Sequence, residues 1–286
     1  MEKETISLIE RIIKSKIKYS VIRKFQNKEV YLIKSKKKKY ILKVYLDSFS
    51  KLLSEKELYG YKLLKKVKIF NIPRLYFFKK GTKYNYLLLD YLNGQKKSIL
   101  YFSFFKFYNF LNKKKFKTIN VNQYFDKNII FKEKKFLKQK FLFIKKYKNQ
   151  KVKKNFSHGD FVHYNVLEYG NKFYTFDFEF FSKNRNYLFD FFNWFTVPIF
   201  HSIIRLNIYF LFSLVINLKL ALLFIILRKN KIIKDRNLFD FYYNLFLLEK
   251  LYLLNFISLN VNLDKHNKKL NKKMSKLINF LIYKRL

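Results

Sequence analysis

The residues of this sequence that are suited to chemistry gather in one window, Asn155–Phe195. His158–Asp160 reads His-Gly-Asp, Asn165 follows five residues later, and Asp177–Glu179 comes after a short predicted strand. A carboxylate and an amide carbonyl are hard oxygen ligands of the kind that magnesium binds, and they leave room for phosphate oxygens. A further carboxylate can accept the proton of an attacking hydroxyl. The window therefore predicts metal-dependent phosphoryl transfer. A His-Gly-Asp turn with only a structural role would not explain why Asn165 and Asp177 accompany it.

The same window resembles the aminoglycoside phosphotransferase and choline kinase superfamily, whose members are relatives of the protein kinases. The runs HGDFVHYN and FDFE carry this general resemblance. The residues that follow look like the choline/ethanolamine kinase pattern, in which a DFE triplet precedes an Asn/Arg segment and an FD-x-x-N-x-F run. They are Asn184-Arg185, Phe189-Asp190, Asn193 and Phe195.

The resemblance implies a role for each matching residue, with ATP and Mg²⁺ as cofactors. Asp160 would be the catalytic base, and Asn165 and Asp177 would hold the magnesium. His158 and Asp190 would support the catalytic loop. The acceptor would be bound partly by Glu179 and Trp194, although Trp194 as an ordinary core residue explains the sequence equally well.

The resemblance also implies a nucleotide site in the N-terminal half. Lys43 lies inside the apolar run Tyr40–Leu46, where a lysine is unusual unless its charge is used, and it matches the phosphate-binding lysine of the family. Its expected partner is Glu57, with Glu55 as the alternative. The run LLLDYLNG, which contains Asp90, resembles the segment whose backbone meets adenine.

Two positions depart from the family pattern. The nucleotide loop, residues 24–29, contains no glycine, so close approach of its backbone to phosphates would rely on Asn27 adopting a positive φ. Gly159 stands where choline kinases commonly have Asn, whereas Gly is common there in aminoglycoside, homoserine and sugar kinases. Glu249, in a later helix, is a further candidate carboxylate for an acceptor.

The elements that must position these residues follow a simple order. The sequence predicts a helix over 1–17, a hairpin of strands over 29–34 and 40–46, a helix over 50–66, and strands over 74–78 and 84–91. Beyond residue 94 the pattern is mainly helical, except over 155–183. We therefore expect an α+β chain with a two-lobed, protein-kinase-like fold. Residues 1–91 would form a small β-rich nucleotide-binding lobe, and residues 92–286 a larger, mainly helical catalytic and acceptor-binding lobe.

The composition limits the other classes of function. The 286 residues carry 62 Lys and Arg against 19 Asp and Glu, a formal net charge of +43. Because residues with A/T-rich codons are enriched throughout, we attribute this charge to base composition and expect no specific nucleic-acid partner. The absence of cysteine excludes disulfides and cysteine-ligated zinc. The apolar stretch 206–227 is interrupted by Lys219, which favours a buried core helix over a membrane span.

The resulting functional expectation is an ATP-dependent kinase that phosphorylates a hydroxyl of a small-molecule acceptor in the cytoplasm. Choline or ethanolamine is the first candidate acceptor. The alternatives are a saccharide in cell-envelope synthesis, an aminoglycoside, or a kinase-fold binding protein without turnover. Contact with an anionic membrane surface stays open, as does the oligomeric state.

Overall fold

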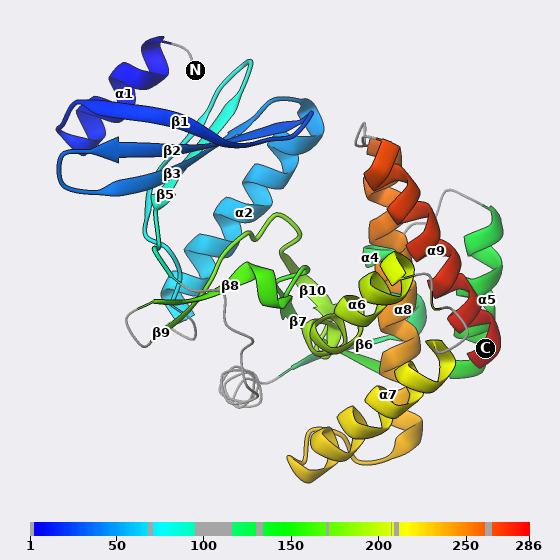
Figure 1. Cartoon of the computed structure of the whole chain (residues 1–286). Helices are drawn as coiled ribbons and strands as arrows, with labels where there is room; N and C mark the ends of the chain where they lie inside the picture. The colour runs from blue at the N-terminus through cyan, green and yellow to red at the C-terminus, as the bar shows by residue number, and fades with distance from the viewer. Residues whose placement is uncertain are drawn as a thin grey trace. The chain divides into compact units, whose positions relative to one another are not determined.

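A computed structural model describes residues 3–67, 71–94, 116–129, 134–169, 172–206, 208, 212–260 and 265–286. The chain divides into two compact units (Figure 1). Unit 1 comprises residues 1–108 and 163–181, and unit 2 comprises residues 109–162 and 182–286. Each unit is described by itself below.

Unit 1 is built around a five-stranded antiparallel sheet with the strand order β1-β2-β3-β5-β4. Its strands are β1 (Ile17–Lys24), β2 (Lys28–Ser35), β3 (Lys39–Tyr45), β4 (Leu75–Lys80) and β5 (Asn85–Asp90). Helix α1 (Lys3–Ile13) and helix α2 (Ser48–Val67) accompany the sheet, and α2 packs against β3 and β5. The same unit contains a small ribbon of β8 (Val166–Tyr169) and β9 (Lys172–Thr175).

The apolar pattern of the central strands explains why they form the middle of this sheet. Leu42 and Val44 of β3 face Ile33 of β2 and Leu88 of β5 in one cluster, which Ile9 of α1 also joins. Burying such side chains contributes roughly 1.5–3 kcal/mol each. This cluster makes β3 a rigid support for whatever its other face presents.

Local hydrogen bonds fix the start of α2. The Asp47 carboxylate accepts the backbone N–H of Ser50 at 2.6 Å, and the Ser50 hydroxyl accepts the backbone N–H of Asp47 at 3.1 Å. This reciprocal pair satisfies two amides that would otherwise lack partners, as in a capping box. Asp47 therefore caps the start of this helix.

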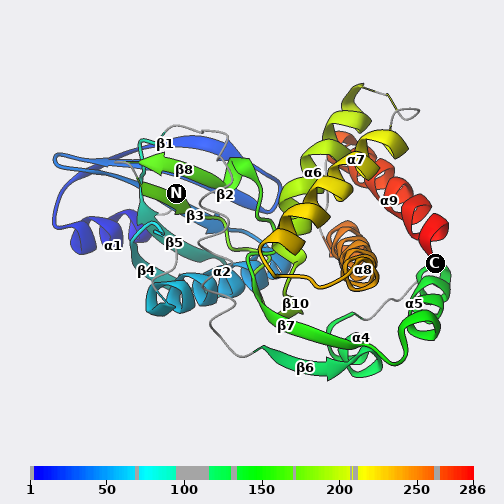
Figure 2. The same ribbon diagram turned by 90° about the horizontal axis from the view of Figure 1, so that it is seen from below.

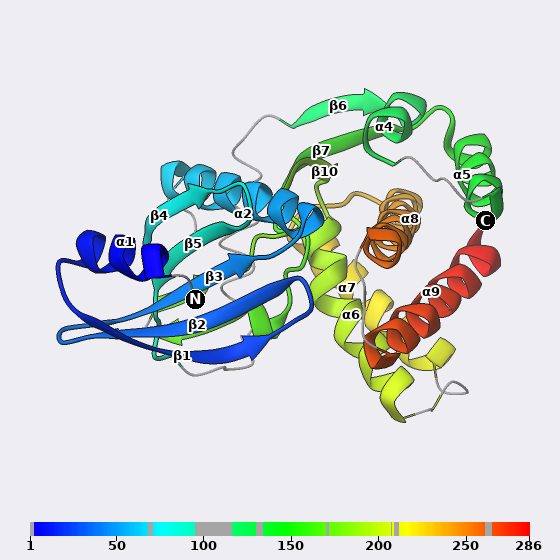
Figure 3. The same ribbon diagram turned by 90° about the horizontal axis from the view of Figure 1, so that it is seen from above.

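Unit 2 combines a three-stranded sheet with a set of helices. The sheet has the order β10-β7-β6, with β6 (Lys117–Asn120), β7 (Lys151–Ser157) and β10 (Ser182–Asn186). The helices are α4 (Val121–Asn128), α5 (Lys134–Tyr147), α6 (Phe189–Leu206), α7 (Phe212–Lys229), α8 (Arg236–Asn260) and α9 (Lys265–Arg285). Helix α8 contacts α5, α6, α9 and β10, and it is buried all round from Phe239 to Leu254 apart from Asp240 and Tyr252 (Figures 2 and 3).

Three sequence expectations differ from the structure. The first helix ends at Ile13, and residues 17–24 form β1, an edge strand whose side chains are mostly exposed and so carry no alternating apolar signal. Strand β6 was likewise not expected. The prediction that the apolar stretch 206–227 forms a buried core helix is only partly confirmed. Helix α6 ends at Leu206, and α7, which covers most of this stretch, keeps an exposed apolar face. Residues 95–115, the first part of the stretch predicted to be mainly helical, lie outside the described residues.

Candidate active site

A buried lysine on β3 organises the charged groups of unit 1. The Lys43 side chain is 9% exposed, and its ammonium lies 2.7 Å from Glu57 Oε1 and 2.6 Å from Asp177 Oδ1. Tyr45, two residues along the strand, donates its hydroxyl to the other oxygen of Glu57. Burial by itself lowers the pKa of Lys43, but the carboxylates of Asp177 and Glu57 outweigh burial and hold this pKa well above its usual value. Lys43 is therefore a fixed positive charge.

The structure settles which helix glutamate faces this lysine. Glu57 is fully buried beside Lys43, whereas Glu55 is exposed at the surface and pairs with Lys80 at 2.6 Å. The two glutamates lie two positions apart on α2, so they point to different faces of the helix. Only Glu57 can hold Lys43.

Asp177 is presented by an unusual backbone conformation. Its φ is 68°, a left-handed value that is uncommon for a residue other than glycine. The next residue, Phe178, is fully buried and packs edge-on against the ring of Tyr61, with 4.9 Å between centroids. Gly60 makes this packing possible, because a Cβ there would lie 2.8 Å from the Cβ of Phe178. Helix α2 thereby aims the carboxylate of Asp177.

The backbone of Asn165 is hydrogen-bonded to the residue that precedes Asp177. The Asn165 carbonyl accepts the backbone N–H of Phe176 at 3.2 Å and the hydroxyl of Thr175 at 3.4 Å, which ties the turn at 163–165 to the end of β9. The hairpin β8–β9 thus brings together two residues that are twelve positions apart in the sequence.

The oxygens at this end of unit 1 suit a divalent cation. One carboxylate oxygen from each of Glu57, Asp177 and Glu179 lies within 4.8 Å of the others. Glu57 is fully buried and engaged by Lys43 and Tyr45, whereas the Asp177 side chain keeps 33% of its surface exposed. A carboxylate with a neighbouring amide carbonyl is the donor set that magnesium prefers. Of these three carboxylates, Asp177 therefore has more room for a cation than Glu57, which is already engaged.

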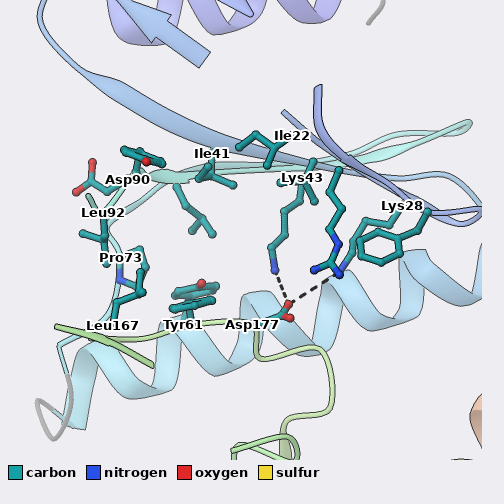
Figure 4. Close-up of a pocket in the computed structure, with 16 residues that line it drawn as sticks. Ile22, Lys28, Ile41, Lys43, Tyr61, Pro73, Asp90, Leu92, Leu167 and Asp177 are labelled. Atoms are coloured by element: carbon teal, nitrogen blue, oxygen red, sulfur yellow. Dashed lines mark hydrogen bonds and ion pairs between the residues drawn. The ribbon is translucent and has the colours of Figure 1, made fainter. Parts of the chain in front are cut away.

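A pocket of about 370 Å³ opens from this charged end (Figure 4). Its lining includes Lys28, Lys43 and Asp177 at one end. The side chains of Pro73, Leu92 and Leu167 make the other end mainly apolar (Figure 4). A pocket with an apolar end and a cationic end matches a molecule that carries a flat ring at one end and phosphates at the other.

Asp90 lies at the end of the pocket away from Lys43 (Figure 4). Its carboxylate pairs with Lys38 at 2.7 Å, and its backbone N–H donates to the Arg74 carbonyl at 3.0 Å. The carboxylate is thus engaged in an ion pair at the end of β5. The pocket lining continues through Tyr91 and Leu92, in the segment that the sequence assigned to the base of a nucleotide.

Lys28, at the start of β2, is a pocket residue that the sequence analysis missed. Its ammonium pairs with Glu179 and lies 3.9 Å from Asp177 Oδ1. Burial lowers the pKa of Lys28, but the carboxylates of Glu179 and Asp177 together raise it above its usual value. With lysine so abundant in this chain, nothing in the sequence distinguished this lysine from its neighbours.

The loop before Lys28 corrects one expectation. Asn27 does not adopt a positive φ; its carbonyl accepts the backbone N–H of Leu46 at 2.9 Å, and the N–H of Phe25 donates to the Lys28 carbonyl at 2.8 Å. The loop therefore closes as an ordinary turn, and it places the side chains of Phe25 and Lys28 in the pocket lining.

In unit 2, Asp190 holds the His158–Asp160 loop. Its carboxylate accepts the backbone N–H groups of His158 at 2.8 Å and Gly159 at 3.1 Å, together with the hydroxyl of Ser157 at 2.9 Å. Gly159 has a φ of 87°, which explains the glycine. His158 Nδ1 accepts the backbone N–H of Asp160 at 3.3 Å. The loop is therefore rigid, and the Asp160 side chain remains 27% exposed.

A second buried lysine faces Asp160, and the sequence analysis did not single it out. The Lys250 ammonium, on α8, lies 3.8 Å from Asp160 Oδ1 and donates to Asn193 Oδ1 at 2.9 Å. Asn193 Nδ2 in turn donates to the Phe161 carbonyl at 3.2 Å. Burial lowers the pKa of Lys250, and Asp160 opposes that shift. Asn193, part of the FD-x-x-N run, thus joins the loop to Lys250.

The candidate acceptor residues lie in different surroundings. Glu179 belongs to unit 1, where it is buried and paired with Lys28. Trp194 belongs to unit 2, is half-buried, and lies 5.2 Å from the ring of Phe161. Glu249 is buried, and its carboxylate accepts hydrogen bonds from Tyr124 and Asn186. The structure therefore does not gather these three as one cluster within either unit.

In comparisons with known proteins, the chain is similar to solved structures. No family model matches the chain, and no curated protein matches its sequence. A protein assigned as a fructosamine-3-kinase from Haemophilus somnus has 16% identity and a TM-score of 0.61, with 99% of this chain and 96% of that chain covered. Choline kinase LicA from Streptococcus pneumoniae has 16% identity and a TM-score of 0.58, with 96% and 99% covered.

An aminoglycoside phosphotransferase shows the same likeness. A thermostable mutant of APH(4)-Ia, in a ternary complex with ADP and hygromycin B, has 9% identity and a TM-score of 0.60, and 99% of each chain is covered. At such low identity these similarities establish the fold. The chain has the α+β, two-lobed, protein-kinase-like fold that the resemblance implied, with an antiparallel sheet in its N-terminal part and mainly helices in its C-terminal part.

Proposed function

We propose that the chain is an ATP- and magnesium-dependent kinase that transfers the γ-phosphoryl group to an alcohol hydroxyl of a small molecule. The observation that carries this proposal is the pocket of unit 1, which is apolar at one end and has the ion-paired Lys43, Glu57 and Asp177 at the other. A nucleotide needs both ends, because its base is flat and weakly polar and its phosphates are anionic.

For each step of the proposed reaction, the chain supplies a side chain that can carry it out. Lys43, fixed by Glu57, neutralises phosphate charge, and the segment around Asp90 and Leu92 packs against the base. Asp177 and Asn165 would hold magnesium, which shields the phosphates when bound. Asp160 accepts the hydroxyl proton as the acceptor oxygen bonds to the γ-phosphorus and the bond from phosphorus to the ADP oxygen breaks. Asp190 and His158 keep the loop in place.

The acceptor that we propose first is choline or ethanolamine. The support is the run from DFE through Asn193 and Phe195, and the half-buried aromatic face of Trp194, which suits a cationic group. A saccharide or an aminoglycoside is the alternative. Gly159 favours both of these acceptors. The positive charge of Lys250 beside Asp160 repels a cationic acceptor, and it therefore favours an uncharged saccharide over an aminoglycoside as well as over choline. The structural neighbours include kinases named for each type of acceptor.

The test is ADP release by the purified protein with magnesium, ATP and a panel of choline, ethanolamine, several sugars and an aminoglycoside. We expect ADP release that depends on one acceptor class and falls at least about 10³-fold in Asp160→Asn, the variant that removes the base but keeps the shape. Asp126→Asn, at an exposed carboxylate of unit 2, is the matched control and should retain activity. Equal rates in wild type and Asp160→Asn would contradict the proposal.

A binding protein without turnover is the second candidate. Its support is that the nucleotide loop lacks glycine and that Lys28 is engaged by Glu179 inside the pocket. A titration of ATP and magnesium, read by thermal unfolding, separates the candidates when no acceptor gives ADP. A rise in Tm that Lys43→Met abolishes supports a nucleotide-binding kinase with an acceptor outside the panel. No rise would contradict the kinase proposal.

A further inference from the structure

Helix α7 of unit 2 has an exposed apolar face. Four side chains, spaced by three or four residues, form what we call the apolar stripe: Leu214 (60% exposed), Leu218 (62%), Leu222 (46%) and Ile225 (60%). The opposite face carries Ile216, Leu220, Leu223 and Leu227, which are almost fully buried. Helix α7 packs chiefly against α6 (Figures 1 and 3). The inner face is thus core, and the stripe is surface.

Such a surface is costly in water. Isolated exposed leucines are ordinary, but a continuous row along about three turns of one helix marks an interaction surface. Among the described residues, no helix is both long and apolar enough to cross a membrane. A helix that is apolar on its outer face and cannot span a bilayer can still lie in the plane of its surface.

The charges around the apolar stripe indicate which kind of partner binds to it. No Asp or Glu occurs from residue 191 to residue 234, whereas this segment contains Arg205, Lys219, Arg228, Lys229, Lys231 and Lys234. Lys219 is exposed on the flank of α7, and Arg228 and Lys229 are exposed at its C-terminal end. Long basic side chains beside an apolar face reach the anionic headgroups of lipids while the apolar face enters the acyl boundary.

A second copy of the chain fits the stripe less well. Each copy carries a formal net charge of +43, and the segment that would meet its counterpart carries only positive charge. Bringing two such surfaces together opposes association, whereas an anionic lipid surface attracts each of them.

We infer that α7 docks flat on an anionic membrane surface, with the apolar stripe inserted and Lys219, Arg228 and Lys229 at the headgroups. This inference goes beyond the proposed kinase activity and does not depend on it. It implies that the protein is held at a lipid surface through unit 2, by a helix that supplies none of the proposed catalytic residues.

The test is co-sedimentation of the full chain with vesicles of phosphatidylcholine alone and with vesicles that also contain phosphatidylglycerol. The variant Leu218→Asn/Leu222→Asn removes the middle of the stripe without changing the net charge. The matched control, Leu137→Asn/Phe141→Asn, changes two exposed apolar residues with the same spacing on α5. Because all four positions are exposed, both variants should fold, and circular dichroism checks this directly.

We expect wild type and the α5 control to bind the anionic vesicles equally, and the stripe variant to bind at least about tenfold more weakly. Binding should be weak to phosphatidylcholine alone and should persist in part at high salt, because the apolar contribution is not screened.

Three results would overturn the inference. The first is no binding to the anionic vesicles. The second is binding that the stripe variant retains and that salt abolishes, which would assign it to the general positive charge of the chain. The third is concentration-dependent association of wild type in ultracentrifugation that the stripe variant loses, which would make a second copy the occupant.

Discussion

At the scale of single residues, the charged end of the unit 1 pocket contains more carboxylates than ammonium groups. Lys28 and Lys43 face the carboxylates of Glu57, Asp177 and Glu179, so two positive charges meet three negative ones. Burial raises the pKa of Glu179 despite Lys28 beside it. The cluster thus has an excess of one negative charge, which attracts a cation.

Lys28 supplies the first prediction. The glycine-free loop offers a side-chain cation to the pocket, so Lys28→Met should weaken ATP binding about tenfold, the effect of losing roughly 1.4 kcal/mol of charge interaction. Isothermal titration with magnesium and ATP measures the Kd. Lys16→Met, at a side chain that is 91% exposed and lies outside the nucleotide loop, is the control and should leave the Kd unchanged. An unaltered Kd in Lys28→Met would mean that Lys28 serves only as the partner of Glu179.

Lys250 supplies the second prediction. Its ammonium lies 3.8 Å from the carboxylate of the proposed base, so it offsets the repulsion between that carboxylate and an incoming phosphoryl group. Lys250→Met should lower kcat about 10- to 100-fold and change the KM for ATP little, because the nucleotide pocket belongs to unit 1.

A structural role for Lys250 would give a different result. Lys250→Arg keeps the charge and should recover part of kcat, whereas a residue needed only for packing would gain nothing from the charge. Asn193→Ala should reproduce a milder version of the Lys250→Met effect, because Asn193 orients the ammonium. If Lys250→Met retains full kcat, the lysine has no part in transfer.

At the scale of elements, α2 is the element that links the lysine strand to the DFE segment. It carries Glu57, which fixes Lys43, and one turn later it carries Gly60 and Tyr61, which receive Phe178. A displacement of α2 would therefore alter the positions of Lys43 and Asp177 together. The three-residue spacing from Glu57 to Gly60 puts both on one face of the helix.

Gly60→Ala tests this coupling. A Cβ at this position would lie 2.8 Å from the Cβ of Phe178 and 3.2 Å from Phe181, so the DFE segment must shift. The overpacking cost of about 1–3 kcal/mol is partly offset by the gain of roughly 1 kcal/mol from replacing a helical glycine. We expect a small change in Tm but a loss of activity of at least about tenfold, since small displacements of catalytic groups slow transfer strongly.

Lys62→Ala, at an exposed position on the same helix, is the matched control for that measurement and should keep wild-type activity. If Gly60→Ala is as active as the control, Phe178 adapts without moving Asp177, and α2 does not set the position of that carboxylate.

At the scale of the whole molecule, the elements that were predicted from sequence are those with a clear apolar period. The hairpin β2–β3, helix α2 and strand β5 each bury one face or most of their length, and that period is visible in the residues. Strand β1 was missed because an edge strand with exposed side chains has no such period. Strand β6 has four residues, too few to show one.

The same contrast holds for the candidate site. Residues in a motif, such as Asp160, Asn165 and Asp177, could be proposed from the sequence because their spacing along the chain is fixed by one loop and one hairpin. Lys28 and Lys250 were missed because each meets its partner across a large separation, 151 residues between Lys28 and Glu179 and 90 between Lys250 and Asp160. A sequence that holds 62 lysines and arginines gives no means of choosing among them.

Glu249 gives the last prediction, because it couples global stability to pH. Burial raises the pKa of this carboxyl to about 7, and the opposing effects of Arg185 and of the hydrogen bonds from Tyr124 and Asn186 do not cancel that rise. The folded state therefore binds the proton more tightly than the unfolded state. The resulting stabilisation is fully present below the unfolded pKa of 4.5 and is lost as the pH rises through about 7.

Glu249→Gln isolates this effect, because glutamine has nearly the same shape and does not titrate. Between pH 5 and pH 8 the free energy of unfolding of wild type should fall by about 2 kcal/mol relative to that of Glu249→Gln. Urea unfolding of both proteins at several pH values measures the difference between their free energies of unfolding. The contributions of all other titrating groups cancel in this difference. A constant difference across this range would mean that Glu249 stays ionised, held by Tyr124 and Asn186 strongly enough to overcome its burial.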